Sequence, residues 1–207
     1  MKRILFNICF LGGLMGIDFD VSLGSTYNFT SDITIHSQVQ GGQDLHFSSQ
    51  PSTYGLKSPQ YYSLRVRHGN KEFELIHHKL YFEKNLPTEI SHFEITDGYN
   101  MLMLNILEPL NFQKHAELLS IRFGLGVVVA HPDVIINGER FYQMGGGLIP
   151  TLWADGYQIS GLSSQIGLNI SKKLKNKFSL NAETKISYAK ATIDLEEEYR
   201  VKVPNLS

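Results

Sequence analysis

The chain is poor in cysteine, in net charge and in long apolar runs, and each shortage excludes a class of protein. Cys9 is the single cysteine among 207 residues, so residues 10–207 can hold no disulfide, cysteine-ligated zinc or thiol nucleophile. The formal net charge of −1 gives no compositional support for nucleic-acid binding. No stretch beyond the N-terminal segment is long enough for a transmembrane helix. If this chain spans a membrane, it must therefore be a closed β-barrel, since only that satisfies every backbone group without helices.

Two common enzyme motifs are missing as well. The glycine run at residues 145–147 lacks the Lys and the Ser or Thr of a phosphate-binding loop. Residues 161–165 come near the G-x-S-x-G pattern of serine hydrolases but lack its last glycine. The sequence therefore supports neither a nucleotide-binding protein of that kind nor a serine hydrolase.

The N-terminal segment has the layout of a secretory signal peptide. Lys2 and Arg3 give it a positive start, and residues 4–15 are uncharged and largely apolar. This apolar run is too short to cross a bilayer as a helix of the mature protein. We expect residues 1–16 to be removed by cleavage near Gly16, which leaves residues 17–207 as one exported domain. A buried N-terminal element is the alternative interpretation.

Alternation of apolar and polar residues with a period of two dominates the rest of the chain and predicts β-strands. It is cleanest at residues 17–23, 119–129, 161–170 and 178–188. Three noisier stretches, at residues 62–67, 72–82 and 99–107, show the same period. Most of these strands are about ten residues long, as a tilted transmembrane strand requires, whereas strands of soluble proteins are mostly about five or six.

The connections between these strands alternate in length. Residues 69–71, 109–116 and 172–177 are short turns, whereas residues 30–59, 83–97 and 130–156 are predicted to be long loops. Short turns at one end and long loops at the other are typical of outer-membrane barrels, which have an even number of strands. We therefore predict an all-β, eight-stranded antiparallel up-and-down transmembrane β-barrel. Its last strand is expected to be truncated, with a partial strand at residues 200–207 and up to about ten residues absent.

Several stretches resemble the small outer-membrane β-barrels known as lipid A oxidase-like proteins. The matching stretches are, in chain order, residues 76–81 against T-H-x-K-x-Y, residues 93–100 against F-E-F-T-D-G-x-N, residues 101–105 in the strand that follows, residues 124–127 with His131, and Tyr157, Gln158 and Gly161 at the opening of the next strand. The specific part of the match lies between residues 70 and 131. His78 departs from the pattern, which has a small residue between the histidine and the lysine.

This resemblance implies an eight-stranded barrel in the outer membrane of a Gram-negative bacterium. A few members of the family convert the proximal glucosamine of lipid A to an aminogluconate in an oxygen-dependent reaction. The resemblance therefore implies outer-membrane lipid or lipopolysaccharide as the partner, with the barrel-assembly machinery inserting a monomeric chain. We expect no tightly bound cofactor, although an oxidase would have a use for a divalent metal.

Five polar residues of the matching region are candidate catalytic residues: His77, Lys79, Glu94, Asp97 and His131. On a strand, His77 and Lys79 share one face and could hold the anionic phosphates of lipid A. Glu94 or Asp97, in a cluster with His92 and Thr96, could act as a general base, or could complete a two-histidine, one-carboxylate metal site with His77 and His131. Alternatively, the histidine and the lysine are ordinary polar residues of the barrel rim, and Asp97 with Gly98 forms a structural turn.

Charged and aromatic residues of the predicted strands have structural interpretations. Arg122, Glu183 and Lys185 point to the predicted barrel interior, which side chains just fill when there are eight strands. Opposed charges there must pair, so we predict an ion network. Aromatic residues at strand ends are predicted to form the interfacial girdle: Tyr61, Tyr62, Tyr81, Phe82, Trp153 and Tyr157.

Two classes of function follow from the sequence. One is a structural or interaction barrel that anchors in the outer membrane and displays loops. The other is a lipid A-modifying, oxidase-like enzyme with its site at the outer rim. A pore for small solutes is disfavoured, because eight strands leave no open channel.

Overall fold

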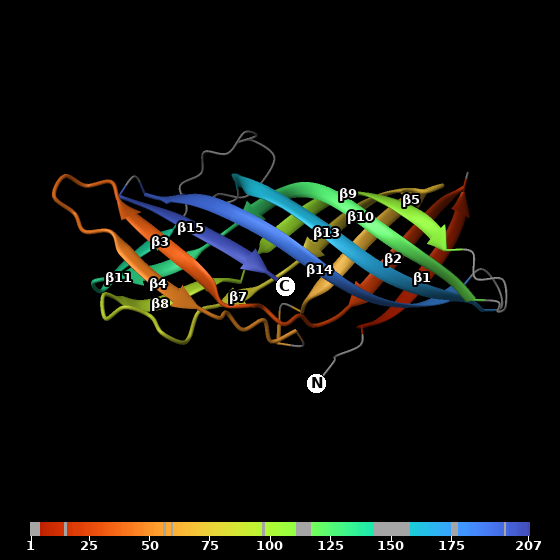
Figure 1. The fold of residues 1–207 in the computed structure, drawn as a ribbon, viewed down its shortest axis with the longest axis horizontal. Coiled ribbons are helices and arrows are strands. Elements are labelled where there is room, and N and C mark those ends of the chain that lie inside the picture. The colour runs from red at the N-terminus through yellow and green to blue at the C-terminus, as the bar shows by residue number, and fades with distance from the viewer. Residues whose placement is uncertain are drawn as a thin grey trace.

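The computed structural model describes residues 5–207 except 15, 56, 59, 97, 111–116, 143–157, 175–177 and 197. This part of the chain contains fifteen β-strands and no helix, so the predicted all-β class is confirmed. Among the same residues there is accordingly no helix with the length and apolar character needed to cross a membrane. Eleven strands form one large antiparallel sheet and four form a smaller one (Figure 1).

The large sheet has the strand order β1-β2-β5-β6-β9-β10-β13-β14-β15-β3-β4, and the small sheet has the order β12-β11-β8-β7. In addition to its pairing with β2, β1 pairs with β14. The strand bounds are β1 Leu5–Leu14, β2 Ile17–Leu23, β3 Ser31–Ser37, β4 Leu45–Ser49, β5 Tyr62–His68, β6 Lys71–His77, β7 Leu80–Tyr81, β8 Ile90–Ile95, β9 Tyr99–Leu110, β10 Glu117–Ala130, β11 Asp133–Ile136, β12 Glu139–Tyr142, β13 Gln158–Lys173, β14 Phe178–Leu195 and β15 Tyr199–Leu206.

All seven predicted strands are present, and three of the four cleanest are longer than predicted. Strand β10 has 14 residues, β13 has 16 and β14 has 18, because each continues past the stretch in which the alternation is clear. The stretch predicted at residues 72–82 is interrupted after His77 and forms two strands, β6 and β7. Residues 69 and 70 form the tight turn between β5 and β6, where Gly69 adopts a φ of 61°.

Three segments that were predicted as long loops contain strands. Strands β3 and β4 lie within residues 30–59, β8 within 83–97, and β11 and β12 within 130–156. Each of these strands has only two or three apolar residues, too few for a period of two to stand out in the sequence. The prediction of long loops was wrong at these positions, where the chain extends the β-structure instead.

The edge of β14 is shared by two strands from opposite ends of the chain. Strand β15 occupies the place predicted for a partial eighth strand and pairs with β14 from Leu195 back to Tyr188. Strand β1, formed by residues of the predicted signal peptide, pairs with β14 from Glu183 to Phe178. Strands β15 and β1 therefore follow one another along the same edge. Removal of residues 1–16 stays a prediction.

The two faces of β14 exchange their character part-way along the strand. Up to Tyr188 the buried positions are polar, with Ser179, Asn181, Glu183 and Ser187. Over the same stretch large apolar side chains are exposed, namely Leu180, Ile186 and Tyr188. Beyond Tyr188 the buried positions become apolar, with Ala189, Ala191, Ile193 and Leu195. The exposed positions there carry Lys190 and Thr192.

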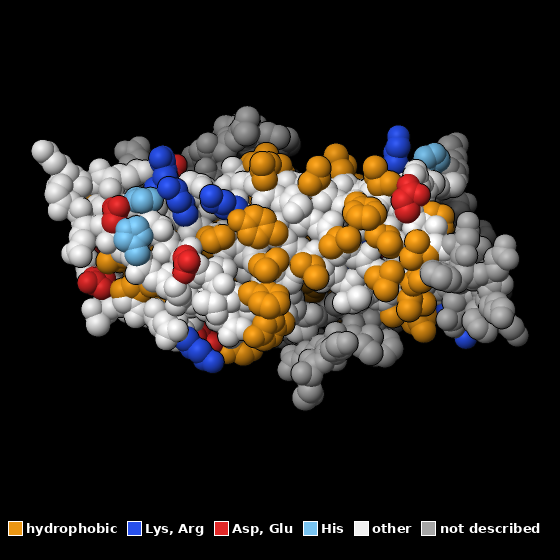
Figure 2. Space-filling model, in the orientation of Figure 1, with side chains coloured by type: hydrophobic (Ala, Val, Ile, Leu, Met, Phe, Trp, Pro, Cys, Tyr) orange, Lys and Arg blue, Asp and Glu red, His pale blue; other side chains and the backbone are white. Residues whose placement is uncertain are grey.

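Neighbouring strands have the same apolar outer surface, which we call the apolar belt. Its exposed side chains are Phe19, Val21, Leu64, Val66, Phe73, Leu104, Ile106, Phe123, Leu125, Leu162, Ile166, Leu168, Ile170, Leu180, Ile186 and Tyr188. In Figure 2 apolar side chains cover the middle of the molecule, whereas histidine and charged side chains gather toward the end where β3, β4, β8 and β11 lie in Figure 1. We call that end the polar-surfaced end.

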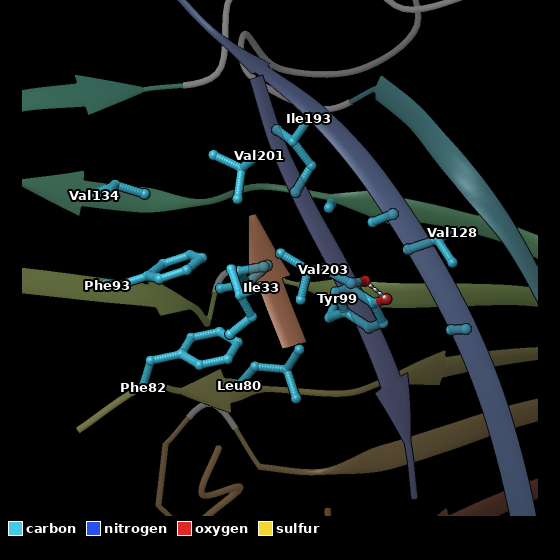
Figure 3. Packing of buried hydrophobic residues seen from close by; sticks show 14 of the residues in the cluster. Ile33, Leu80, Phe82, Phe93, Tyr99, Val128, Val134, Ile193, Val201 and Val203 are labelled. Carbon is cyan, nitrogen blue, oxygen red and sulfur yellow. Dashed lines mark hydrogen bonds between the residues drawn. The ribbon is translucent and has the colours of Figure 1, made fainter. Parts of the chain in front are cut away.

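The hydrophobic core lies inside the polar-surfaced end. Its side chains come from both sheets and point toward one another, as Phe82, Phe93, Ile193 and Val201 do in Figure 3. The rings of Phe82 and Phe93 stack with centroids 4.3 Å apart. Tyr99 on β9 donates a hydrogen bond from its hydroxyl to the carbonyl oxygen of Val203 on β15 (3.0 Å).

The prediction of an aromatic girdle is wrong for several residues, because they are buried. Tyr61 and Phe82 are core residues rather than exposed girdle residues, because each lies just outside its strand, β5 or β7, and packs into the hydrophobic core of the polar-surfaced end. Tyr81 is likewise buried. Trp153 and Tyr157 lie outside the described residues.

Candidate functional site

A network of buried ions occupies the enclosed face of the large sheet beneath the apolar belt. Arg65 on β5 donates from Nε to Glu74 Oε1 on β6 (2.8 Å), and its Nη2 lies 3.0 Å from Glu183 Oε2 on β14. Arg122 on β10 donates from Nε to Glu72 Oε1 (2.8 Å) and also contacts Glu183. Since all five side chains are buried, each charge is stabilised by its ion-pair partners rather than by water.

Lys185 and two amides complete the network. Lys185 Nζ donates to Glu74 Oε1 (3.0 Å), and Gln165 Nε2 donates to Glu74 Oε2 (2.6 Å). Asn105 Nδ2 donates to both Glu72 and Glu74 at 2.9 Å. The prediction that Arg122, Glu183 and Lys185 pair in the interior is confirmed.

A glycine makes room for this network on β10. The Cβ of a larger residue at Gly124 would lie 2.0 Å from Asn105 Oδ1 and 2.9 Å from Gln165 Cγ. The alternation of β10 places position 124 on the inner face, where an alanine would displace both amides. The glycine is therefore part of the packing that keeps the carboxylates bonded.

The structure gives the predicted catalytic residues His77 and Lys79 structural partners. The His77 ring stacks on Tyr62 with centroids 5.0 Å apart, and its Nδ1 is hydrogen-bonded to Asn100 Oδ1 (2.8 Å). Lys79 is fully buried, and its Nζ donates to the carbonyl oxygens of Tyr54 (3.4 Å) and Lys57 (2.5 Å). His77 ends β6, whereas Lys79 lies in the break before β7, and the two side chains have different partners.

The other three predicted catalytic residues belong to the region of β8 to β11. Glu94 Oε1 accepts a hydrogen bond from the Thr96 hydroxyl (2.9 Å). The His131 backbone N–H donates to the Gly98 carbonyl oxygen (3.0 Å). Asp97 lies outside the described residues.

A cluster of potential metal ligands forms around Glu94. Among the residues that the structure describes, the ligand atoms that come within 4.8 Å of one another are those of His92, Glu94 and Asp133, not those of His77 and His131. His92 and Glu94 alternate along one strand, which the sequence could reveal. Asp133 was missed, because only the pairing of β8 with β11 brings it opposite Glu94.

Arg140 holds Asp133 on the same surface. Its Nε donates to Asp133 Oδ1 (2.8 Å), and its Nη2 contacts Oδ2. The hydrogen bonds from Arg140 lower the pKa of Asp133 below its usual value, although partial burial opposes the shift. Asp133 is thus kept as a carboxylate, the form that binds cations.

A cavity of about 830 Å³ opens between residues 25–29 and the part of β14 from Glu183 to Ser187. It lies where β15 ends and β1 has not yet begun to pair with β14. Asn28 on its wall donates to the Pro51 carbonyl oxygen (2.9 Å) and to Thr53 Oγ1 (2.8 Å), so this wall is held by internal hydrogen bonds.

The fold and these sites define the chain as an all-β protein with a curled antiparallel sheet. Over one half the sheet has apolar side chains outside and an ion network inside. Over the other half it has polar side chains outside and apolar side chains inside. Comparison with protein-family models, with curated proteins and with solved structures gives no match to this chain.

Proposed function

We propose that this chain is an outer-membrane β-barrel protein that anchors a rigid β-structure at the cell surface. In this proposal eight strands close around the ion network: β1, β2, β5, β6, β9, β10, β13 and β14. The sequence of backbone pairings supports closure, because it leads from β1 through these strands to β14 and then back to β1. A closed ring leaves no unpaired sheet edge in lipid.

The observation that carries the proposal is the exchange of polarity along β14. In water, the exposed apolar face from Leu180 to Tyr188 would be unfavourable, and the ionic interior beneath it would be an unusual core. In a bilayer both features are expected, since the outer face meets hydrocarbon and the inner face is sheltered from it. The stretch is nine residues long, which matches the roughly 9–11 residues of a tilted transmembrane strand.

The polar-surfaced end supports the proposal that a rigid β-structure is anchored at the cell surface. Beyond Tyr188 the strand continues with Lys190 and Thr192 outside and apolar residues inside, as in a protein surrounded by water. We therefore infer that this end projects from the membrane as a rigid extension with its own hydrophobic core. Longer connections lie on the outer side of such barrels, so we propose that this end faces the outside of the cell.

The filled interior favours an anchor over a pore. Beneath the belt the described side chains form the ion network, and in the polar-surfaced end they form the hydrophobic core. A solute path would have to cross both. Lipid A modification stays a prediction from the resemblance, because His77 and Lys79 have structural partners and no observation favours a reaction at them.

Membrane fractionation tests the proposal. We expect the expressed protein in the outer-membrane fraction, resistant to extraction by alkaline carbonate, with unheated protein migrating faster on gels than heated protein. Recovery of folded protein from the periplasm without detergent would contradict the proposal. The same gel shift serves as the folding control for every variant described below.

A further inference from the structure

Three potential metal ligands lie together on the outer face of the small sheet, beyond the apolar belt. Strands β8 and β11 are antiparallel neighbours with Glu94 directly opposite Asp133, and His92 is two residues before Glu94 on the same face. His92 Nε2 lies 3.8 Å from Glu94 Oε2 and 3.6 Å from Asp133 Oδ2. All three side chains thus come from strands whose register fixes them.

The imidazole nitrogen at the centre of this group has no hydrogen bond. Within the described part of the chain, His92 Nε2 is shielded from solvent and finds no hydrogen-bond partner. Its distances to the two carboxylate oxygens exceed those of a hydrogen bond. A shielded polar atom without a partner is unfavourable, and a cation between the nitrogen and the two oxygens would satisfy all three.

We propose that His92, Glu94 and Asp133 form a zinc-binding site. The mixed set of one nitrogen and two oxygens suits Zn²⁺, whereas Ca²⁺ and Mg²⁺ take oxygen ligands. A tetrahedral Zn²⁺ with bonds of about 2.0–2.1 Å holds its ligand atoms roughly 3.3–3.4 Å apart. The three atoms already lie within 4.8 Å of one another, so rotation of the carboxylates brings them to that spacing. The fourth position is left to water or to a donor from outside.

Both carboxylates are held by hydrogen bonds to their other oxygens, as metal ligands commonly are. Thr96 donates to Glu94 Oε1 (2.9 Å), and Arg140 Nε donates to Asp133 Oδ1 (2.8 Å), so neither bond uses the oxygen nearest His92. Arg140 Nη2, by contrast, contacts Oδ2 and would compete with the ion. The side chain of Arg140 is 51% exposed, so it can move aside when the ion binds.

A zinc ion here would join β8 to β11 and present an open coordination position at the polar-surfaced end. The register of two strands forms this site whether or not the chain spans a membrane, so failure of either proposal leaves the other intact. Calorimetric titration of Zn²⁺ into the folded full chain in detergent tests it. We expect one equivalent to bind, and excess Mg²⁺ not to displace it.

Substitution of a ligand should weaken the site. His92→Gln and Asp133→Asn are each expected to lower the zinc affinity by at least about tenfold. His36→Gln is the matched control, because His36 lies on β3, where its partners are Asp44 (Nδ1–Oδ2 2.8 Å) and Lys202 (Nε2–Nζ 3.1 Å) and not the three proposed ligands. This variant should leave zinc binding unchanged. The proposal is overturned if the unmodified chain binds no zinc, or if folded His92→Gln binds it as tightly.

Discussion

An arginine in place of Ile166 should destabilise the folded protein far more than an arginine in place of Ser48. Ile166 lies midway along the exposed apolar run of β13 from Leu162 to Ile170, and its neighbours in register are Phe123 and Ile186. Ser48 lies on β4 in the polar-surfaced end, directly opposite Asp32. Both positions face outward on strands, so the two variants differ mainly in the medium that surrounds the new charge.

The expected magnitudes differ clearly. An arginine near the middle of the bilayer on the lipid face of a barrel costs about 2–4 kcal/mol, which lowers the folding equilibrium constant roughly 30- to 900-fold. An exposed substitution in water changes stability by about 0.5 kcal/mol or less. Urea titration of refolding into lipid vesicles, followed by the gel shift, measures both. If Ile166→Arg costs no more than Ser48→Arg, the apolar belt does not face lipid and the reasoning fails.

Three further predictions concern the ion network, the Asp133 carboxylate and lipid A. Arg122→Met should cost about 3–5 kcal/mol in the same titration, because it leaves Glu72 and Glu183 buried without that partner; a neutral effect would mean that the network is hydrated. Arg140→Gln should raise the pKa of Asp133, because the arginine lowers it. The stability that this carboxylate contributes above its ordinary pKa should then be lost at a higher pH as the solution is acidified. A carboxyl titration that is unchanged by NMR would contradict the ion pair. Mass spectra of lipid A from cells with and without the gene should be the same if the protein is only an anchor, and an aminogluconate present only with the gene would establish the enzyme instead.

The sequence predicts the long strands well, but it predicts the short strands and the side-chain partners across strands poorly. The strict alternation of β10 and β13 runs over about ten residues, enough to separate a period of two from other patterns. The short strands β11 and β12 offer four residues each, so their apolar residues could not be told from those of a loop.

The partners of charged residues depend on which strands meet. Arg65 and Glu183 are 118 positions apart, and the alternation shows only that both point inward. The same limit hid Asp133 from the site at Glu94. The enclosed face of the long strands could therefore be predicted, but the contacts across it could not.

The predicted signal peptide contains the residues of strand β1, and the two assignments exclude each other in the mature protein. If residues 1–16 are removed on export, β1 cannot be the strand that pairs with β14 and β2 in the mature protein. The intact mass of the membrane-inserted protein distinguishes the signal peptide from the barrel strand. A mass that includes residues 1–16 supports β1 as a barrel strand, and the mass of a chain that starts near Ile17 supports the signal peptide.

Chemical labelling of single cysteines tests the transmembrane barrel most directly. With Cys9 replaced by serine the chain has no other thiol, so Ile166→Cys and Thr192→Cys each report on one position. On intact cells, a membrane-impermeant maleimide should label Thr192→Cys at the polar-surfaced end. It should leave Ile166→Cys unlabelled even after the cells are broken, until the protein is unfolded. Equal labelling of the two positions in the folded protein would contradict the account.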